Sequence, residues 1–141
     1  MDIRPLSPTF AVSPQIAVED IPAIKEAGYT TIICNRPDPE VPPSHQQQAI
    51  GDAAVAAGLT FIVNPVTHQT MTLDIVDTQK ASMDQSEGPV LAYCASGTRS
   101  SILWSFAQAK EMSADEIIAA TSNAGYDLGG MRGQLDALAE R

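Results

Sequence analysis

Four short apolar runs recur along the chain, and longer segments with helical spacing separate them. The 30–34 and 59–63 runs are rich in β-branched residues, and Gly or Pro lies close to each of the four, a pattern typical of buried strands. The 30–34 and 59–63 runs are expected to be buried, and the first of them central and parallel. Strands that alternate with helices predict an α/β domain, with a mostly parallel central sheet of four or five strands and helices on both faces. The four runs are residues 9–13, 30–34, 59–63 and 90–93.

The segments between these runs are predicted to be helices. Ser13 is expected to cap the first helix, with Pro14 at its first helical position. Pro22 falls inside this segment and indicates a break, or a restart of the helix at Asp20. The remaining predicted helices are 45–57, 71–85, 100–112 (with Ile102, Leu103, Phe106 and Ala109 on one buried side), 113–123 (opened by a Ser-x-x-Glu capping box) and 127–140.

A strand, a tight loop and a helix follow one another between Pro89 and Met112, and Cys94 stands where the strand ends. A loop that enters a helix directs several backbone N–H groups to one point, and the helix dipole adds positive potential there. Such a cradle binds an oxyanion and also stabilises a thiolate. Arg99 lies five positions after Cys94 and offers a planar fork for two oxygens of an anion.

These residue types predict a nucleophilic site. Cys94 is the expected nucleophile, Arg99 the anion-binding group, and Ser100 a hydroxyl donor that makes the sulfur a better leaving group. The backbone of the four loop residues is expected to bind substrate, and a glycine among them lets the loop turn inward. The alternative is a buried structural cysteine followed by a polar helix cap. The four loop residues are Ala95, Ser96, Gly97 and Thr98.

The Cys-x4-Arg-Ser sequence after a strand resembles the phosphate-binding loop of cysteine-dependent phosphatases, which is usually one residue longer. The same loop resembles the six-residue active loop of single-domain rhodaneses. Three stretches together, residues 12–16, 27–38 and the Cys94 loop, resemble the phosphatase-like domain of beta-lactamase hydrolase-like proteins over roughly residues 2–112. That resemblance implies a tyrosine/dual-specificity phosphatase-like fold and hydrolysis of a phosphoester through a phosphocysteine.

A proline-rich polar loop from Asn35 to Pro43 leaves the carboxyl end of the 30–34 strand, the edge where α/β sheets place their sites. Its four prolines are expected to exclude regular structure. Arg36 and Glu40 are therefore candidates for function. Arg36 is expected to support the bound anion or to fasten the Cys94 loop, and the alternative is a surface salt bridge with Asp38 or Glu40.

A phosphatase of this kind needs a general acid, usually an Asp on a loop above the cysteine. Residues 64–70 contain no Asp. Asp74 comes next, but it falls in a first helical turn, where the helix dipole alone favours an acidic residue. His68 is a weaker candidate for the acid. The lack of an Asp general acid on this loop predicts a lower rate, or activity restricted to substrates with good leaving groups.

The chain has 141 residues, and 8 basic against 17 acidic side chains give it a net charge of −9. This balance argues against nucleic acid as a partner and against a very highly charged substrate. Two cysteines and two histidines without metal-ligand spacing predict no metal site, and no cofactor is expected. Cys34 is expected to be a buried thiol, or a partner of Cys94 in a reversible disulfide.

The apolar runs are too short to span a membrane, and the N-terminus lacks the pattern of a signal peptide. We therefore expect a cytoplasmic protein of one phosphatase-like domain, residues 1–141, that does not bind a membrane. Its expected substrate is a phosphorylated small molecule or protein. Two alternatives stay open: a sulfurtransferase that carries a persulfide on Cys94, and a weak or inactive module that binds anions or phosphopeptides. The sequence leaves the oligomeric state unknown.

Overall fold

The computed structural model describes residues 1–141 and centres on a five-stranded sheet with the order β1-β2-β5-β3-β4. Neighbouring strands are parallel except for β1, which pairs antiparallel with β2. The predicted sheet is thus confirmed, and β5 occupies its centre. The strands are β1 (Arg4–Ser7), β2 (Phe10–Ser13), β3 (Thr31–Cys34), β4 (Thr60–Val63) and β5 (Val90–Tyr93).

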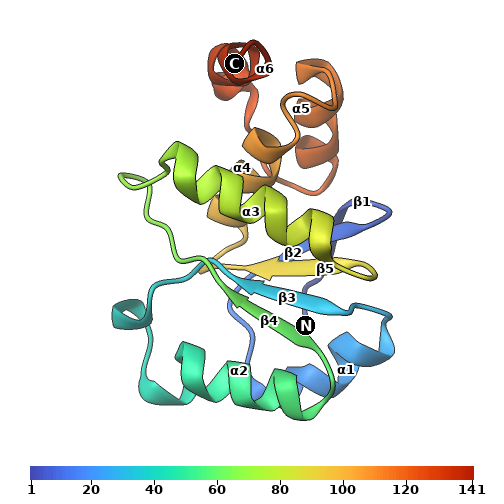
Figure 1. Ribbon diagram of the computed structural model, residues 1–141, viewed down its shortest axis with the longest axis vertical. Coiled ribbons are helices and arrows are strands. Elements are labelled where there is room, and N and C mark those ends of the chain that lie inside the picture. The colour runs from blue at the N-terminus through green and yellow to red at the C-terminus, as the bar shows by residue number, and fades with distance from the viewer.

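Helices cover both faces of the sheet, as Figure 1 shows. On one face α1 (Ile21–Glu26) and α2 (Gln47–Ala56) enclose a core of 11 buried residues. On the other, a larger core of 17 buried residues lies under the four remaining helices. None of the helices has the length and apolarity that crossing a membrane requires. The four are α3 (Leu73–Gln85), α4 (Thr98–Ala107), α5 (Ala114–Asn123) and α6 (Arg132–Ala139).

The parallel arrangement brings four loops to one edge of the sheet. β2, β3, β4 and β5 all run in the same direction, so their carboxyl ends meet there. The residues that follow these strands are Pro14, Asn35, Asn64 and Cys94. The loop with the motif cysteine therefore lies between the loops that follow β2 and β3.

The prediction for the first helix was wrong at its start. Ser13 ends β2 and its hydroxyl donates to the carbonyl of Pro14, so it caps no helix. A short 3₁₀ turn at Val18–Asp20 precedes α1, and Pro22 occupies the second helical position of α1. A proline there costs no helical hydrogen bond, which is why the helix restarts at this point.

Two strands differ from expectation. The 59–63 run forms β4, but β4 is an edge strand whose residues are exposed or half-buried, and Val63 is 46% exposed. The prediction of a buried strand was therefore wrong. β1 was not predicted, because Arg4 and Pro5 are unusual within strands. Pro5 suits an edge strand, where its missing backbone N–H faces no partner.

Helix α4 is shifted and shorter than expected, since it begins at Thr98 and ends at Ala107. Every residue of α4 after Thr98 is buried. The helix lies between the sheet and the outer helices (Figure 1), so it has no solvent-facing side. The four residues expected on one side are all buried, but the rest of the helix is buried as well, and the helix places Arg99 inside the molecule.

Other elements match the sequence pattern closely. Thr72 caps α3 and Ser113 caps α5, the latter in the predicted capping box with Glu116.

Two further segments differ from expectation. The 127–140 segment divides into a 3₁₀ turn at Gly129–Met131 and α6, because glycines weaken its start. The proline-rich loop also contains two short 3₁₀ turns, Asp38–Glu40 and Pro43–His45, which the four prolines were expected to exclude.

Three buried amides join the loops after β3 and β4 to α3. Asn35 and Asn64 both donate to the Gln79 side-chain oxygen at 2.9 Å. Gln79 returns a hydrogen bond to Asn35 Oδ1 at 3.2 Å, and Asn35 also donates to the backbone oxygen of Asn64 at 2.9 Å. Because buried amides are costly when unpaired, this network fixes the two loops relative to the sheet.

We predict that Gln79→Met lowers the free energy of unfolding by about 1–3 kcal/mol, because Asn35 and Asn64 lose a buried hydrogen-bond acceptor. Urea denaturation measures this loss. Gln85→Met, at the exposed end of the same helix, is the matched control and is expected to change stability little. Equal stability of the two variants would contradict a structural role for the amide network.

Candidate active site

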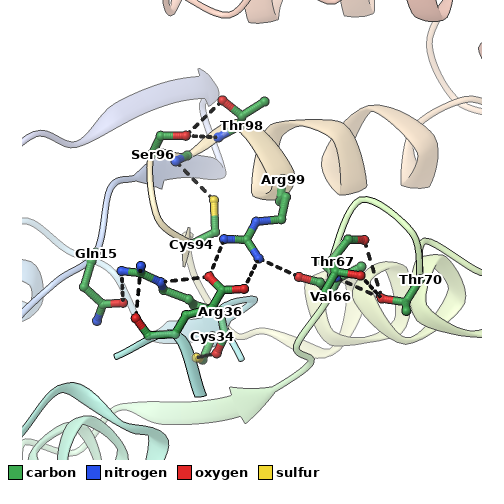
Figure 2. A network of polar contacts seen from close by, with 12 residues as sticks. Gln15, Cys34, Arg36, Val66, Thr67, Thr70, Cys94, Ser96, Thr98 and Arg99 are labelled. Carbon is green, nitrogen blue, oxygen red and sulfur yellow. Dashed lines mark hydrogen bonds and ion pairs between the residues drawn. The ribbon is translucent and has the colours of Figure 1, made fainter. Parts of the chain in front are cut away.

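Cys94 directly follows β5 and is buried, with 1% of its surface exposed. The loop after it turns at Gly97, whose φ of +96° lies in the left-handed region that favours glycine. The backbone N–H of Gly97 donates to the Cys94 sulfur at 3.1 Å (Figure 2). Helix α4 begins at the next residue, so the predicted strand, loop and helix are present and the sulfur lies at the helix N-terminus.

An open pocket of about 370 Å³ lies over this loop. Ala95 and Ser96 are exposed there, and the hydroxyls of Ser96 and Thr98 lie 3.0 Å apart. The Thr98 backbone N–H donates to the Ser96 hydroxyl at 3.4 Å, which stiffens the rim of the loop. The lining residues come from three loops and the start of α4: Glu40, Thr67, His68, Gln69, Ala95, Ser96, Thr98 and Arg99.

Arg99 forms a two-point ion pair with Glu40. Its Nη1 and Nη2 donate to the two carboxylate oxygens at 2.9 and 2.8 Å, and Nη1 also donates to the Val66 backbone oxygen at 2.9 Å. Hydrogen bonds from Arg99 hold the pKa of the Glu40 carboxyl below its ordinary value, and the same bonds raise the pKa of Arg99. The carboxylate is therefore ionised at neutral pH and the guanidinium is fixed.

These contacts leave one edge of the guanidinium without an oxygen acceptor. An arginine carries five N–H groups, and Glu40 and Val66 accept three of them from Nη1 and Nη2. The remaining N–H groups, on Nε and Nη2, are parallel and suit two oxygens of one anion. Figure 2 shows the Arg99 guanidinium beside the Cys94 side chain, so this edge lies near the sulfur.

Arg36 does not line the pocket and instead supports Glu40. Its Nε donates to the Glu40 carboxylate at 3.1 Å, which confirms the alternative of a salt bridge with Glu40. Its Nη1 donates to the Gln15 side chain at 3.3 Å, and the Gln15 backbone N–H donates to the Ala95 oxygen at 3.2 Å. Arg36 is thus connected to the Cys94 loop through Gln15.

The hydrogen bond predicted from Ser100 to Cys94 is absent. The Ser100 hydroxyl is buried and donates to Asn35 Oδ1 at 2.9 Å, so the amide network takes up its proton. The sulfur instead receives its hydrogen bond from Gly97. Sequence spacing placed Ser100 correctly beside the loop but could not show that Asn35 competes for its hydroxyl.

The other titratable candidates, Cys34, His68 and Asp74, lie in three different parts of the structure. Cys34 is a free buried thiol that donates to the Arg36 backbone oxygen at 3.4 Å, and burial raises the pKa of this thiol. His68 is exposed in the wall of the pocket, whereas Asp74 lies in the first turn of α3 and is not part of the lining. No group of three or more His, Cys, Asp or Glu residues is arranged to hold a metal ion.

Two contacts at the site were missed from the sequence. Glu40 was a candidate, but its pairing with Arg99, 59 residues away, has no signature in spacing. Tyr126 lies in the C-terminal segment expected only to pack, and its hydroxyl donates to the Ser96 backbone oxygen at 2.9 Å. Both contacts depend on the tertiary fold alone.

Comparison with known proteins places this geometry in a family. The model of the phosphatase-like domain of beta-lactamase hydrolase-like proteins matches residues 2–111. The chain belongs to this family. A beta-lactamase hydrolase-like protein of Agrobacterium fabrum is 37% identical over 103 residues, which are 72% of this chain and 23% of that protein. The chain thus spans about a quarter of the length of this curated relative.

Solved structures share the fold. A candidate phosphatase of Neisseria meningitidis (nma1982) is 40% identical, with a TM-score of 0.83 over 98% of this chain and 99% of that one. A kinase associated phosphatase, solved with its catalytic site cysteine substituted by serine, is 12% identical with a TM-score of 0.68, over 93% of this chain and 84% of that one. At that identity the second likeness shows the fold alone. The family model and the Neisseria structure thus place the chain among the phosphatase-like domains.

We predict that Glu40→Gln lowers the free energy of unfolding at pH 7 by about 0.5–1 kcal/mol, since Arg99 loses a charged partner that solvent partly screens. Because the pKa of Glu40 is lowered by folding, its contribution is complete above the ordinary glutamate pKa of about 4.3 and is lost as the pH falls below it. Denaturation between pH 7 and pH 3 therefore measures a shrinking difference from wild type. Glu19→Gln, an exposed site, is the control, and a difference independent of pH would contradict the ion pair.

Proposed function

We propose that the chain is a cysteine-dependent phosphoester hydrolase that acts through a phosphocysteine. The observation that carries this proposal is the free Nε/Nη2 edge of Arg99, which Glu40 and Val66 hold beside Cys94. A guanidinium edge beside a thiol at a helix N-terminus suits an anion whose central atom the sulfur attacks. The proposed substrate is a phosphorylated small molecule or protein.

In the proposed first step, the Cys94 thiolate attacks phosphorus and the bond from phosphorus to the ester oxygen breaks. The leaving oxygen departs with the electron pair of that bond and takes a proton from solvent. Two equatorial oxygens bind the free edge of Arg99, and loop N–H groups stabilise the charge that develops on the phosphoryl group. The N–H of Gly97 stabilises the attacking thiolate before this step.

In the proposed second step, water attacks phosphorus, the bond from phosphorus to sulfur breaks, and phosphate leaves while the thiolate is restored. A hydroxyl donor to the departing sulfur speeds this step. Ser100 fits this role only if its hydroxyl turns from Asn35 to the sulfur, because Asn35 accepts it in the resting arrangement. Both steps conserve charge and need no cofactor.

The pocket offers little help with protonation of the leaving group. Its titratable lining residues are Glu40, Arg99 and His68, and the first two are committed to their ion pair. A general acid contributes about 10²–10⁴-fold to such reactions. We therefore propose that the enzyme favours substrates whose leaving groups depart without a proton, such as aryl phosphates.

The first test is hydrolysis of p-nitrophenyl phosphate by wild type and Cys94→Ser across pH 4 to 9. We expect wild type to turn over this activated ester and Cys94→Ser to lose at least about 10³-fold in kcat, since serine is a poor nucleophile at these pH values. Cys34→Ser is the matched control and is expected to keep its activity, because Cys34 contacts Arg36 rather than the pocket.

Failure of the wild type to hydrolyse this ester would overturn the phosphatase proposal. Sulfur that cyanide releases from Cys94 would then identify a sulfurtransferase, in keeping with the six-residue loop from Cys94 to Arg99. Binding of vanadate without either activity would identify a binding module.

A second prediction concerns the leaving group. Across substituted phenyl phosphates, kcat/KM is expected to fall steeply as the pKa of the leaving phenol rises, with alkyl phosphates at least about 100-fold slower than p-nitrophenyl phosphate. His68→Asn is expected to leave this slope unchanged, because His68 is exposed and has no partner that orients it. A shallow slope in wild type that steepens in His68→Asn would instead identify His68 as the acid.

A further inference from the structure

The peptide unit between Ser96 and Gly97 is held at both of its polar ends. Its carbonyl oxygen accepts a hydrogen bond from the Tyr126 hydroxyl at 2.9 Å, and its N–H donates to the Cys94 sulfur at 3.1 Å. A trans peptide is planar, so its C=O and N–H point in opposite directions. Tyr126 therefore binds the outer end of the peptide whose inner end contacts the sulfur.

Tyr126 also fills the space beside Gly97. A Cβ on residue 97 would overlap the hydroxyl oxygen of Tyr126. Two constraints therefore require glycine at position 97: its φ of +96° and this contact with Tyr126. Because glycine allows many backbone angles, the residue by itself does not fix the orientation of the peptide that precedes it.

Tyr126 is itself fixed in place. Its ring is buried, and the Arg4 guanidinium lies 5.2 Å above the ring centre. Arg4 also donates to the Ala124 oxygen at 3.2 Å, and the Tyr126 backbone N–H donates to the Thr121 oxygen at 2.9 Å. Burial raises the pKa of Tyr126, so its hydroxyl keeps the proton that it donates to Ser96.

We propose that Tyr126 is a positioning residue that holds the Gly97 N–H on the Cys94 thiolate. The proposal rests on the role of Cys94 as the reactive thiol of the proposed function. Without the hydroxyl, the Ser96–Gly97 peptide is free to rotate, and rotation turns a carbonyl oxygen toward the sulfur. A carbonyl dipole repels a thiolate where an N–H stabilises it, so the thiolate forms at higher pH.

Other titratable and charged groups near Cys94 stay in place when only the Tyr126 hydroxyl is removed. Arg99 faces the sulfur from α4 and keeps Glu40 as its partner. Cys34 lies on the neighbouring strand β3, and His68 lies in the pocket wall. Arg4 stacks on the ring of residue 126 from β1, and a phenylalanine ring preserves that contact. A shift caused by Tyr126→Phe therefore reports on the Ser96–Gly97 peptide.

The test is the rate of alkylation of Cys94 by iodoacetamide as a function of pH, read by mass spectrometry of the Cys94 peptide so that Cys34 is scored separately. In Tyr126→Phe we expect the midpoint of the pH profile to rise by about one unit, with alkylation about tenfold slower below the midpoint. Tyr29→Phe, which changes a half-buried tyrosine remote from the loop, is the control and should match wild type. Phenylalanine keeps the buried ring, so the fold is expected to survive, and thermal melting checks this.

A second measurement follows the Gly97 amide resonance by NMR. In wild type it should move with the titration of Cys94, and in Tyr126→Phe most of this movement should be lost. An unchanged alkylation midpoint in Tyr126→Phe, or a Gly97 resonance that ignores the thiol in wild type, would overturn the proposal. Neither measurement needs phosphoester turnover, so a protein inactive toward p-nitrophenyl phosphate still tests Tyr126, and the two proposals fail separately.

Discussion

The ion pair of Arg99 with Glu40 connects the first turn of α4 to the proline-rich loop after β3, and the geometry of the site follows from it. The Arg99 side chain is 10% exposed, so its position is decided by protein partners rather than by water. Two acceptors hold one side of the guanidinium, and only the opposite edge stays open to a ligand. Arg36 pairs with the same carboxylate. The site therefore contains two guanidinium groups for one carboxylate, which gives it local positive charge in a chain of net charge −9.

The scaffold behind this pair is built from contacts that differ in kind. The sheet directs four loops to one edge through the parallel order of its strands. The buried amides of Asn35, Asn64 and Gln79 then hold two of these loops together by mutually satisfied hydrogen bonds. Burial of α4 on all sides completes the arrangement, because a helix enclosed by apolar neighbours cannot shift its N-terminus without opening the core. Rigidity at the site thus comes from packing and buried polar pairing together.

Features set by residues close together in the sequence could be predicted, whereas contacts between residues far apart in the sequence could not. The strand, loop and helix around Cys94 depend on residues within about one turn of one another. Their spacing predicted the type and order of these elements, together with the sheet, but not the bounds of the helix. The start of α1, the exposure of β4 and the existence of β1 depend on which neighbour each segment finds, so periodicity misjudged them. At the site, Cys94, Gly97 and Arg99 came from the motif. The partners Glu40 and Tyr126 lie 59 and 30 residues from the groups they contact, and no spacing rule reaches that far.

The contact between Tyr126 and Ser96 has a consequence for how this family is divided into modules. The family model ends at residue 111, whereas Tyr126 lies beyond it and contacts the loop that carries the motif. The boundary of the family model therefore lies between the Cys94 loop and the tyrosine that contacts it. A fragment that ends at residue 111 keeps Cys94 and Arg99 but loses the hydrogen bond from Tyr126 to the Cys94 loop.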